Sequence, residues 1–437
     1  MPVVVVHVQV TKGCPAIPNR VSCWVAFTTL SLVACLPLLT AQESSQHDWY
    51  APLTNGDGLR YPLEIGPLTL HVVGSGIYPV KGSDGLIHLA YALQVTNAWS
   101  LTATIKSVEV VDPARGNQVS GNNRVLDVKN EDVTGQVKLF TLPGTMNKES
   151  YTNQIPSGQS GVMFFDVTYN DISQVPKVIA HRLTVTTPPT PIGTEHTAVG
   201  RSIPVGREAI VLSPPLKGSG WLNGNGCCLE VGPHRFVTNS MNGTLDPSET
   251  FAIDWVQVDA HGLAYRTDGK KPEDWIGYGA EITAAAPGTV VEVMRDLQDV
   301  TPGKNPEGLT IAQIAGNRVI IDMGSGHYAM YAHLAPGSVQ LHVGDYVRQG
   351  QKLGLLGNTG NSSGPHLHFQ VMDRPSSLDD TSLPFVFDHM NLEGRVSLDL
   401  TALDENTDKK IAMPMDKNEA KPLTRAMPLS RDVEGFQ

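Results

Sequence analysis

Residues 328–371 read YAMYAHLAPGSVQLHVGDYVRQGQKLGLLGNTGNSSGPHLHFQV, and this stretch decides the fold of the second half of the chain. Short apolar segments alternate with polar residues and are interrupted by glycines, which predicts short β-strands joined by hairpins. Side chains two residues apart in a strand project from the same face. His366 and His368 are therefore expected side by side on one face, with Leu367 and Phe369 turned into a core on the other.

Two adjacent imidazoles suggest metal chemistry. A neutral imidazole is a common zinc ligand, and a catalytic zinc usually has three protein ligands and a water. One of the two can also handle protons beside the metal. A His-x-His pair alone is weak support, since two surface histidines need no function. The preceding glycine-rich run GNTGNSSGP, residues 357–365, strengthens the case because it lets the backbone approach closely.

The whole stretch closely resembles the signature of the lysostaphin/LytM-type zinc metallopeptidases, which cut peptide bridges in bacterial cell walls. The pattern Tyr-x-His-Leu, a Gly-x-x-Val-x-x-Gly-x-x-Leu-Gly segment and the final Pro-His-Leu-His-Phe occur here in the family's order. Upstream, AAAPGTVV at residues 284–291 and FAIDW at residues 251–255 match further family strands. The resemblance covers residues 232–373 and does not extend to the first half of the chain.

The resemblance implies a role for each matching residue. His368 and Asp254 would be zinc ligands, and His366 and His333 would be the catalytic imidazoles. One position departs from the family pattern, because the first ligand normally lies four residues before the aspartate, where this chain has Thr250.

His234 is the best substitute for the missing ligand. It lies 20 residues before Asp254, and the intervening Asn242-Gly243 pair is typical of a hairpin turn that would bring the two together. His261 is the second choice, although in an extended strand it would lie on the face opposite to Asp254. The predicted metal set is therefore His234, Asp254 and His368, with Zn²⁺ as the cofactor.

The sequence thus predicts a zinc metalloendopeptidase that hydrolyses peptide bonds, with peptidoglycan cross-bridges as the substrate that the resemblance implies. The alternative is a degenerate LytM-like domain that has lost the metal and binds the cell wall or regulates another wall hydrolase. The sequence contains no His-Glu-x-x-His motif, which argues against a helical zinc protease.

The composition narrows the remaining function classes. A hydrophobic content of 41% with 17% charged residues suits folded domains rather than a disordered chain. The formal net charge of −11 and the lack of a basic block argue against nucleic-acid binding.

The N-terminal residues 1–41 look like a targeting segment, with Arg20 followed by an uncharged, largely apolar run. A signal peptide cleaved near Ala41, a lipoprotein modified at Cys35 and an uncleaved membrane anchor remain open. All three place the protein outside the cytoplasm: periplasmic, in the cell envelope or secreted.

The predicted fold class is all-β, with an N-terminal immunoglobulin-like β-sandwich followed by a LytM-like β-barrel or antiparallel-sheet peptidase domain. Strands are expected at residues 68–73, 86–96, 105–111, 133–142, 161–169 and 178–185 in the first part. The expected domains are residues 42–195 (the sandwich), 196–219 (a linker), 220–403 (the peptidase) and 404–437 (a polar tail, with one strand folded back as an alternative).

Other features of the first part and its borders carry no clear chemistry. The isolated His88 and His181 read as structural histidines, and the sandwich is a candidate docking module for the wall or a protein partner. Proline-rich residues 187–193 are expected to end the sheet. Adjacent Cys227 and Cys228 read as buried packing or a disulfide in an oxidising compartment.

Overall fold

The computed structural model describes residues 53–54, 60–61, 64–123, 137–139, 151–206, 209–228, 234–304, 306–397 and 412–437. The targeting segment and its cysteines lie outside these residues, as does most of the strand expected at residues 133–142. Over the described part the chain is built from β-strands, with only short 3-10 turns as helical segments, so the all-β prediction is confirmed. None of those turns has the length and hydropathy needed to cross a bilayer.

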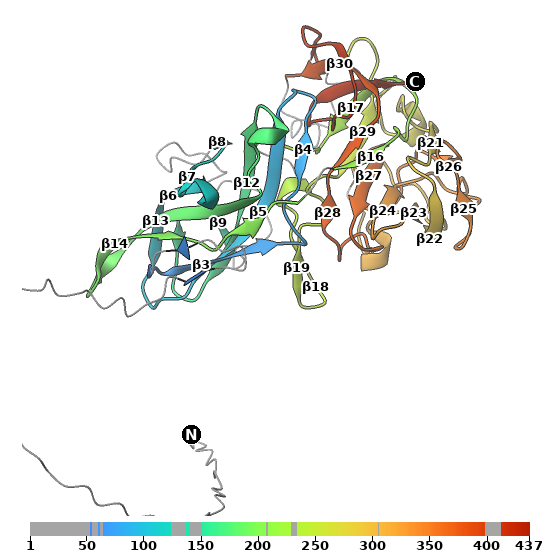
Figure 1. Cartoon of the computed structure of the whole chain (residues 1–437). Coiled ribbons are helices and arrows are strands. Elements are labelled where there is room, and N and C mark those ends of the chain that lie inside the picture. The colour runs from blue at the N-terminus through green and yellow to red at the C-terminus, as the bar shows by residue number, and fades with distance from the viewer. Residues whose placement is uncertain are drawn as a thin grey trace, which may run out of the picture. The chain divides into compact units, whose positions relative to one another are not determined.

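The first part consists of two antiparallel sheets, visible in blue and green in Figure 1. One sheet contains β3 (Leu68–Val73), β4 (Pro79–Lys81), β5 (Ile87–Asn97), β8 (Asn122–Asn123), β9 (Val137–Leu139), β10 (Tyr151–Thr152) and β12 (Ser160–Tyr169). The other contains β6 (Ala103–Asp112), β7 (Gln118–Val119), β11 (Gln154–Ile155), β13 (Val178–Thr190), β14 (Gly193–Val199) and β15 (Ile203–Pro204). A short pair, β1 (Leu53–Thr54) and β2 (Arg60–Tyr61), precedes them.

Both sheets contribute to one apolar core, because the alternating strands β5 and β12 of the first and β6 and β13 of the second supply its buried residues. Five of the strands expected from the sequence are found at or close to their expected bounds. The immunoglobulin-like character of this part stays a prediction.

The second part is dominated by a twelve-stranded sheet in the order β25-β22-β23-β24-β27-β20-β17-β33-β30-β31, with β28 on β27 and β32 on β30. Its strands are β17 (Gly218–Gly224), β20 (Ile253–Gln257), β22 (Gly288–Met294), β23 (Arg318–Asp322), β24 (Tyr328–Ala332), β25 (Tyr346–Val347), β27 (Leu367–Met372), β28 (Ser382–Leu383), β30 (Met390–Val396), β31 (Met415–Asp416), β32 (Lys421–Leu423) and β33 (Asp432–Phe436).

Three small pairs accompany the large sheet: β16 (Ile210–Leu212) with β29 (Phe385–Phe387), β18 (Asn239–Met241) with β19 (Thr244–Asp246), and β21 (Glu281–Thr283) with β26 (Lys352–Leu355). The β18–β19 turn is the expected Asn242-Gly243 hairpin, and both residues have the positive φ that such a tight turn requires. The 3-10 turns are η1 (Pro113–Arg115), η5 (Ile172–Gln174), η6 (His234–Phe236), η7 (Pro272–Asp274) and η8 (Ile311–Gln313).

Three adjacent strands of the large sheet set the positions of the predicted site residues. In β27, Leu367 and Phe369 are fully buried in the core, as the alternation predicts. The antiparallel register places His368 directly opposite Asp254 on β20 and opposite Ala332 on β24. Residues directly opposite in an antiparallel sheet project from the same face, so strand pairing alone brings the Asp254 and His368 side chains together.

The structure corrects the expectation that residues 187–193 end the sheet. Strand β13 runs through Pro188 and Pro189 to Thr190 and pairs with β14. The pairing register shifts between Thr186 and Thr190, so the prolines, which cannot donate backbone hydrogen bonds, fall in a bulge. Further along, the region expected to be a linker also carries β15, β16 and the start of β17.

Residues 412–437, part of the expected polar tail, carry strands, and β33 folds back onto the large sheet as the alternative for this segment allowed. Strand β33 is buried throughout and pairs with β17 on one side and β30 on the other, and the C-terminus lies beside these strands in Figure 1. The sequence of β33 does not look like that of a core strand because it contains two acidic residues, Asp432 and Glu434, both of which are buried in the structure. Asp432 accepts from Arg395, and one carboxylate oxygen of Glu434 accepts from the Trp255 indole N–H.

Candidate metal centre

The predicted site residues line one cleft with a volume of about 540 Å³. Its lining includes Asp254, His333, His366 and His368, together with Gly303 and residues 361–363 and 377–378 from the surrounding loops. His234 lies in η6 and reaches the same cleft from outside the sheet. Thr250, although buried, is not among the residues that line it, and exposed His261 is not either.

Asp254 is the centre of the arrangement. Its Oδ1 lies 2.9 Å from His368 Nδ1 and 3.4 Å from His366 Nε2, and its Oδ2 lies 3.1 Å from His234 Nε2. One donor atom from each of His234, Asp254 and His368 can be chosen so that all lie within 4.8 Å of one another. The sequence-predicted ligand set is therefore brought together in space, across 114 residues of chain between Asp254 and His368.

Each imidazole of the cleft has its second ring nitrogen held by an oxygen acceptor. Nδ1 of His234 bonds to the Ala252 carbonyl at 3.2 Å, Nδ1 of His333 to the Thr359 carbonyl at 2.7 Å and Nδ1 of His366 to the Gly364 carbonyl at 2.7 Å. Nε2 of His368 bonds to Gln370 Oε1 at 3.0 Å. A carbonyl oxygen can only accept, so each of these nitrogens carries the proton.

The consequence is a fixed tautomer for all four rings. In the neutral imidazoles, the nitrogens that face the cleft are left with free lone pairs: Nε2 of His234, His333 and His366, and Nδ1 of His368. A metal-binding histidine typically shows this arrangement, because the outer hydrogen bond orients the ring and raises its basicity.

The donor set fits zinc. Two imidazole nitrogens and a carboxylate are a common ligand set for catalytic zinc, with a further position left for water. The close approach of an unprotonated His368 Nδ1 to a carboxylate oxygen would be repulsive unless a cation or a proton lies between them. A metal ion held by His234, Asp254 and His368 would be such a cation.

Burial and charge shift the ionisation of these groups. Burial alone would raise the pKa of Asp254, but the charges of His234 and His366 outweigh it and hold that pKa well below its ordinary value. Burial lowers the pKa of His234, whereas Asp254 and Glu249 outweigh this effect and raise it to about 9. Burial, reinforced by His366 and His368, holds the pKa of His333 well below its ordinary value. The cleft is thus a site where a carboxylate stays ionised among closely packed imidazoles.

The backbone at His333 supports a special role for that residue. Its φ of 61° lies in the left-handed region, which is unusual for a residue other than glycine. The Ala315 carbonyl accepts from its backbone N–H, and the centroid of its ring lies 4.6 Å from that of His366, with the two ring planes tilted by 50°. Such backbone strain concentrates at functional sites.

Three polar residues of the site were missed in the sequence. Asn225 donates from its amide to Asp254 Oδ2 at 2.8 Å, Glu249 lies 3.9 Å from His234 Nε2, and Gln370 holds His368. Gln370 had a readable signal, since it lies on β27 two residues after His368 and therefore on the same face. Asn225 and Glu249 had none, because only the packing of the strands brings them to the cleft.

Residues 275–380 match the model of peptidase family M23.

The M23 segment contains His333, His366 and His368, whereas His234 and Asp254 precede it. Peptidoglycan DD-endopeptidase ShyA of Vibrio cholerae is 42% identical over 60 residues, which are 14% of this chain and 14% of the relative. Lysostaphin of Staphylococcus simulans is 47% identical over 58 residues, 13% of this chain and 11% of the relative. The chain therefore spans only about one seventh of the length of the first curated relatives that it matches.

Among solved structures, the crystal structure of a zinc containing peptidase from Vibrio cholerae aligns over 71% of this chain and 83% of its own, at 15% identity and a TM-score of 0.24. A TM-score of this size supports no conclusion about the fold or the site.

Proposed function

We propose that this chain is a zinc-dependent endopeptidase that hydrolyses peptide bonds in peptidoglycan. The observation that carries the proposal is the convergence of His234 Nε2, His368 Nδ1 and the Asp254 carboxylate on one point of an open cleft, with two further imidazoles beside it. The position of His234 beside Asp254 supports the proposal that His234 serves as a ligand where this chain has Thr250 at the usual ligand position.

His234, Asp254 and His368 would hold the zinc. When bound, zinc lowers the pKa of a coordinated water towards about 7 and polarises a carbonyl group. Asn225 contributes by donating a hydrogen bond to Asp254 Oδ2, which orients the carboxylate and spreads its charge.

The two remaining imidazoles would move protons. His333 presents an unprotonated Nε2 to the cleft because its Nδ1 proton is held by the Thr359 carbonyl, so it can accept the proton of the attacking water. His366 holds a proton at Nδ1 through Gly364, and its Nε2 lies beside the Asp254 carboxylate, which favours a second proton there. That Nε2 proton would be donated to the carbonyl oxygen as negative charge develops, or to the leaving nitrogen.

Two observations support a peptide substrate from the cell wall. Two relatives that match part of this chain bear the names peptidoglycan DD-endopeptidase and lysostaphin. The cleft also combines apolar walls, from Ile314, Met330 and Leu378, with the polar loop of Asn361, Ser362 and Ser363, which suits an extended peptide better than a small charged ligand. Peptidoglycan lies outside the cytoplasmic membrane, so this function requires export, the role expected for residues 1–41.

The test combines metal counting with cleavage. Zinc is measured per mole of purified protein, and release of soluble peptides from purified peptidoglycan is followed with and without a chelator. We expect one zinc at the cleft and activity that is lost on chelation and restored by zinc. His368→Ala should lose both metal and cleavage, whereas His342→Ala, a substitution of an exposed histidine outside the cleft, should lose neither.

Peptidoglycan binding without zinc and without cleavage would contradict the proposal and support the degenerate domain. Cleavage that survives both chelation and His368→Ala would contradict the assigned metal centre.

A further inference from the structure

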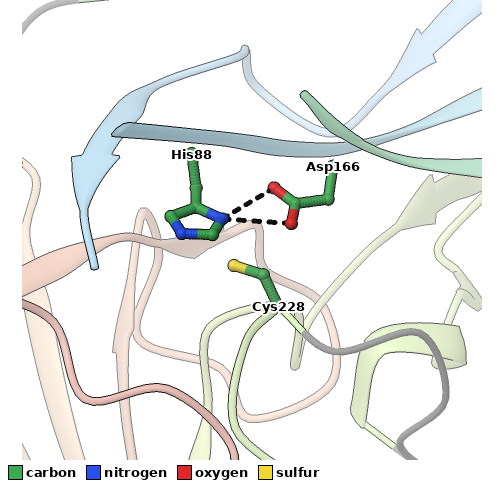
Figure 2. Close-up of side chains that lie close together, drawn as sticks. All are labelled: His88, Asp166 and Cys228. Carbon is green, nitrogen blue, oxygen red and sulfur yellow. Dashed lines mark hydrogen bonds and ion pairs between the residues drawn. The ribbon is translucent and has the colours of Figure 1, made fainter. Parts of the chain in front are cut away.

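A second group of potential metal donors shares no residue with the cleft. Figure 2 shows His88 on β5, Asp166 on the neighbouring strand β12 and Cys228, which follows β17, turned toward one another. His88 Nδ1 lies 3.0 Å from both carboxylate oxygens of Asp166. Donor atoms of the three residues all lie within 4.8 Å of one another. His88 and Cys228 are buried and Asp166 is half-buried.

The other ring nitrogen of His88 has its own carboxylate partner. His88 Nε2 lies 3.3 Å from both carboxylate oxygens of Asp84. Gly82 makes room for this contact, since a Cβ at that position would lie 2.9 Å from His88 Nε2 and 2.8 Å from Asp84 Oδ1. A carboxylate–histidine hydrogen bond behind a donor nitrogen is the usual outer support of a metal-binding histidine. His88 Nδ1 is thus the nitrogen available for a metal, and Asp84 is its positioning residue.

The cluster is built to hold positive charge. Burial lowers the pKa of His88, but hydrogen bonds to Asp166 and Asp84 and the charges of both outweigh it and raise the pKa to about 9. Two carboxylates therefore surround one protonated imidazole. A divalent cation bound between His88 Nδ1, Asp166 and a thiolate would replace that proton with a larger charge of the same sign.

The third donor, Cys228, is held in a disulfide bond. Cys228 is bonded to its neighbour Cys227, and a disulfide sulfur is a poor metal ligand because the thiolate is the form that binds metal. A dithiol can break this bond by exchange: it gives up two electrons and two protons, the S–S bond becomes two thiols, and the dithiol closes to its own disulfide.

We infer that reduction of the Cys227–Cys228 disulfide opens a second metal site, in which His88 Nδ1, the Asp166 carboxylate and Cys228 Sγ bind a zinc-type divalent cation. One nitrogen, one oxygen and one sulfur donor suit zinc, with a water completing four-coordination. Binding releases two protons, one from His88 and one from the Cys228 thiol. The ion would join strands β5 and β12 of the first part to the segment that follows β17 in the second. This inference does not depend on the proposed peptidase function.

The experiment uses the full chain carrying His368→Ala, so that the cleft lacks a ligand and metal counting reports the second group. Cobalt serves as the probe, because a cobalt–thiolate bond produces a charge-transfer band in the near ultraviolet. A phosphine serves as the reductant, since it opens the disulfide without competing for the metal as a dithiol would. We expect no band before reduction, and one cobalt with a band after it.

Cysteine variants in the same background separate the roles of the two sulfurs. Cys227→Ser leaves Cys228 as a permanent thiol and should bind one cobalt without reductant. Cys228→Ser removes the donor but cannot form the disulfide either, so it should show no band in any state. Asp166→Asn should weaken cobalt binding at least tenfold, because it replaces the anionic ligand.

The inference is overturned if the reduced chain binds no cobalt, if it unfolds on reduction as judged by circular dichroism, or if Cys228→Ser keeps the band. The comparison of the chain before and after reduction needs no cysteine substitution, so it decides the matter even where a variant fails to fold.

Discussion

The hydrogen bond from His368 Nε2 to Gln370 can be removed with little change in volume by Gln370→Leu. Gln370 is fully buried, accepts from His368 at 3.0 Å and donates to Asp380 Oδ2 at 3.4 Å. Without the acceptor, His368 is free to carry its proton on Nδ1, the nitrogen that faces Asp254. That proton would occupy the lone pair that the metal requires.

The expected loss of zinc affinity follows from the removal of one hydrogen bond that orients a metal ligand. Loss of such a partner typically weakens metal affinity 10- to 100-fold, which is about 1.4–2.7 kcal/mol. A further cost of about 1–3 kcal/mol to folding is expected, because a buried N–H is left without a partner. Zinc affinity is measured by competition with a chromophoric chelator, and folding by thermal unfolding of the metal-free protein.

Gln370→Glu is the matched control, since a carboxylate oxygen can accept the same proton from Nε2. We expect it to retain more zinc affinity than Gln370→Leu. The reasoning is refuted if Gln370→Leu binds zinc as tightly as the unaltered chain, or if both variants lose affinity equally while remaining folded.

Three further predictions follow from the geometry. His234→Ala should abolish stoichiometric zinc retention, measured by elemental analysis, whereas Thr250→Ala should retain it; the reverse result would move the third ligand back to the position usual in the family. His333→Ala should lower kcat for peptide release by about 10²- to 10⁴-fold while leaving zinc content unchanged, and loss of zinc instead would show that His333 is a ligand. Burial lowers the pKa of His181 to about 3. Below the ordinary pKa of 6.5 the unfolded chain binds a proton at this residue and the folded chain does not. The free energy of unfolding therefore falls as the pH drops from 6.5 towards 3. His181→Gln, which keeps a partner for the Tyr91 hydroxyl, should reduce the loss of unfolding free energy between pH 6.5 and about pH 4.5 by roughly 2 kcal/mol; an unchanged pH dependence in denaturant titrations would contradict this.

Several features of the fold could be predicted from the sequence because they depend on residues that are close together in the chain. Alternation with a period of two located most strands of the first part and assigned Leu367 and Phe369 to the core. The Asn242-Gly243 pair was found as the β18–β19 turn, since few residue pairs accept two positive φ values in succession.

Other features depended on pairing that no local pattern records. The path of β13 through Pro188 and Pro189 needs a bulge, and a bulge is a property of two strands. The burial of Asp432 in β33 needs Arg395, which lies on another strand of the sheet. His88, read as an isolated structural histidine, lies beside a carboxylate on each ring nitrogen only because β5 pairs with β12 and the preceding turn folds back.

The sequence by itself determined which residues could do the chemistry, since the His366-Leu367-His368 alternation and the family motif around it are local in the chain. Only the tertiary structure decided how those residues meet. The β20–β27 register sets Asp254 against His368, and η6 brings His234 to the same carboxylate in place of the usual position at Thr250. The physical reason is that strand period fixes the face on which a side chain lies, whereas the partner across the sheet is set by register, which is a long-range property of the folded chain.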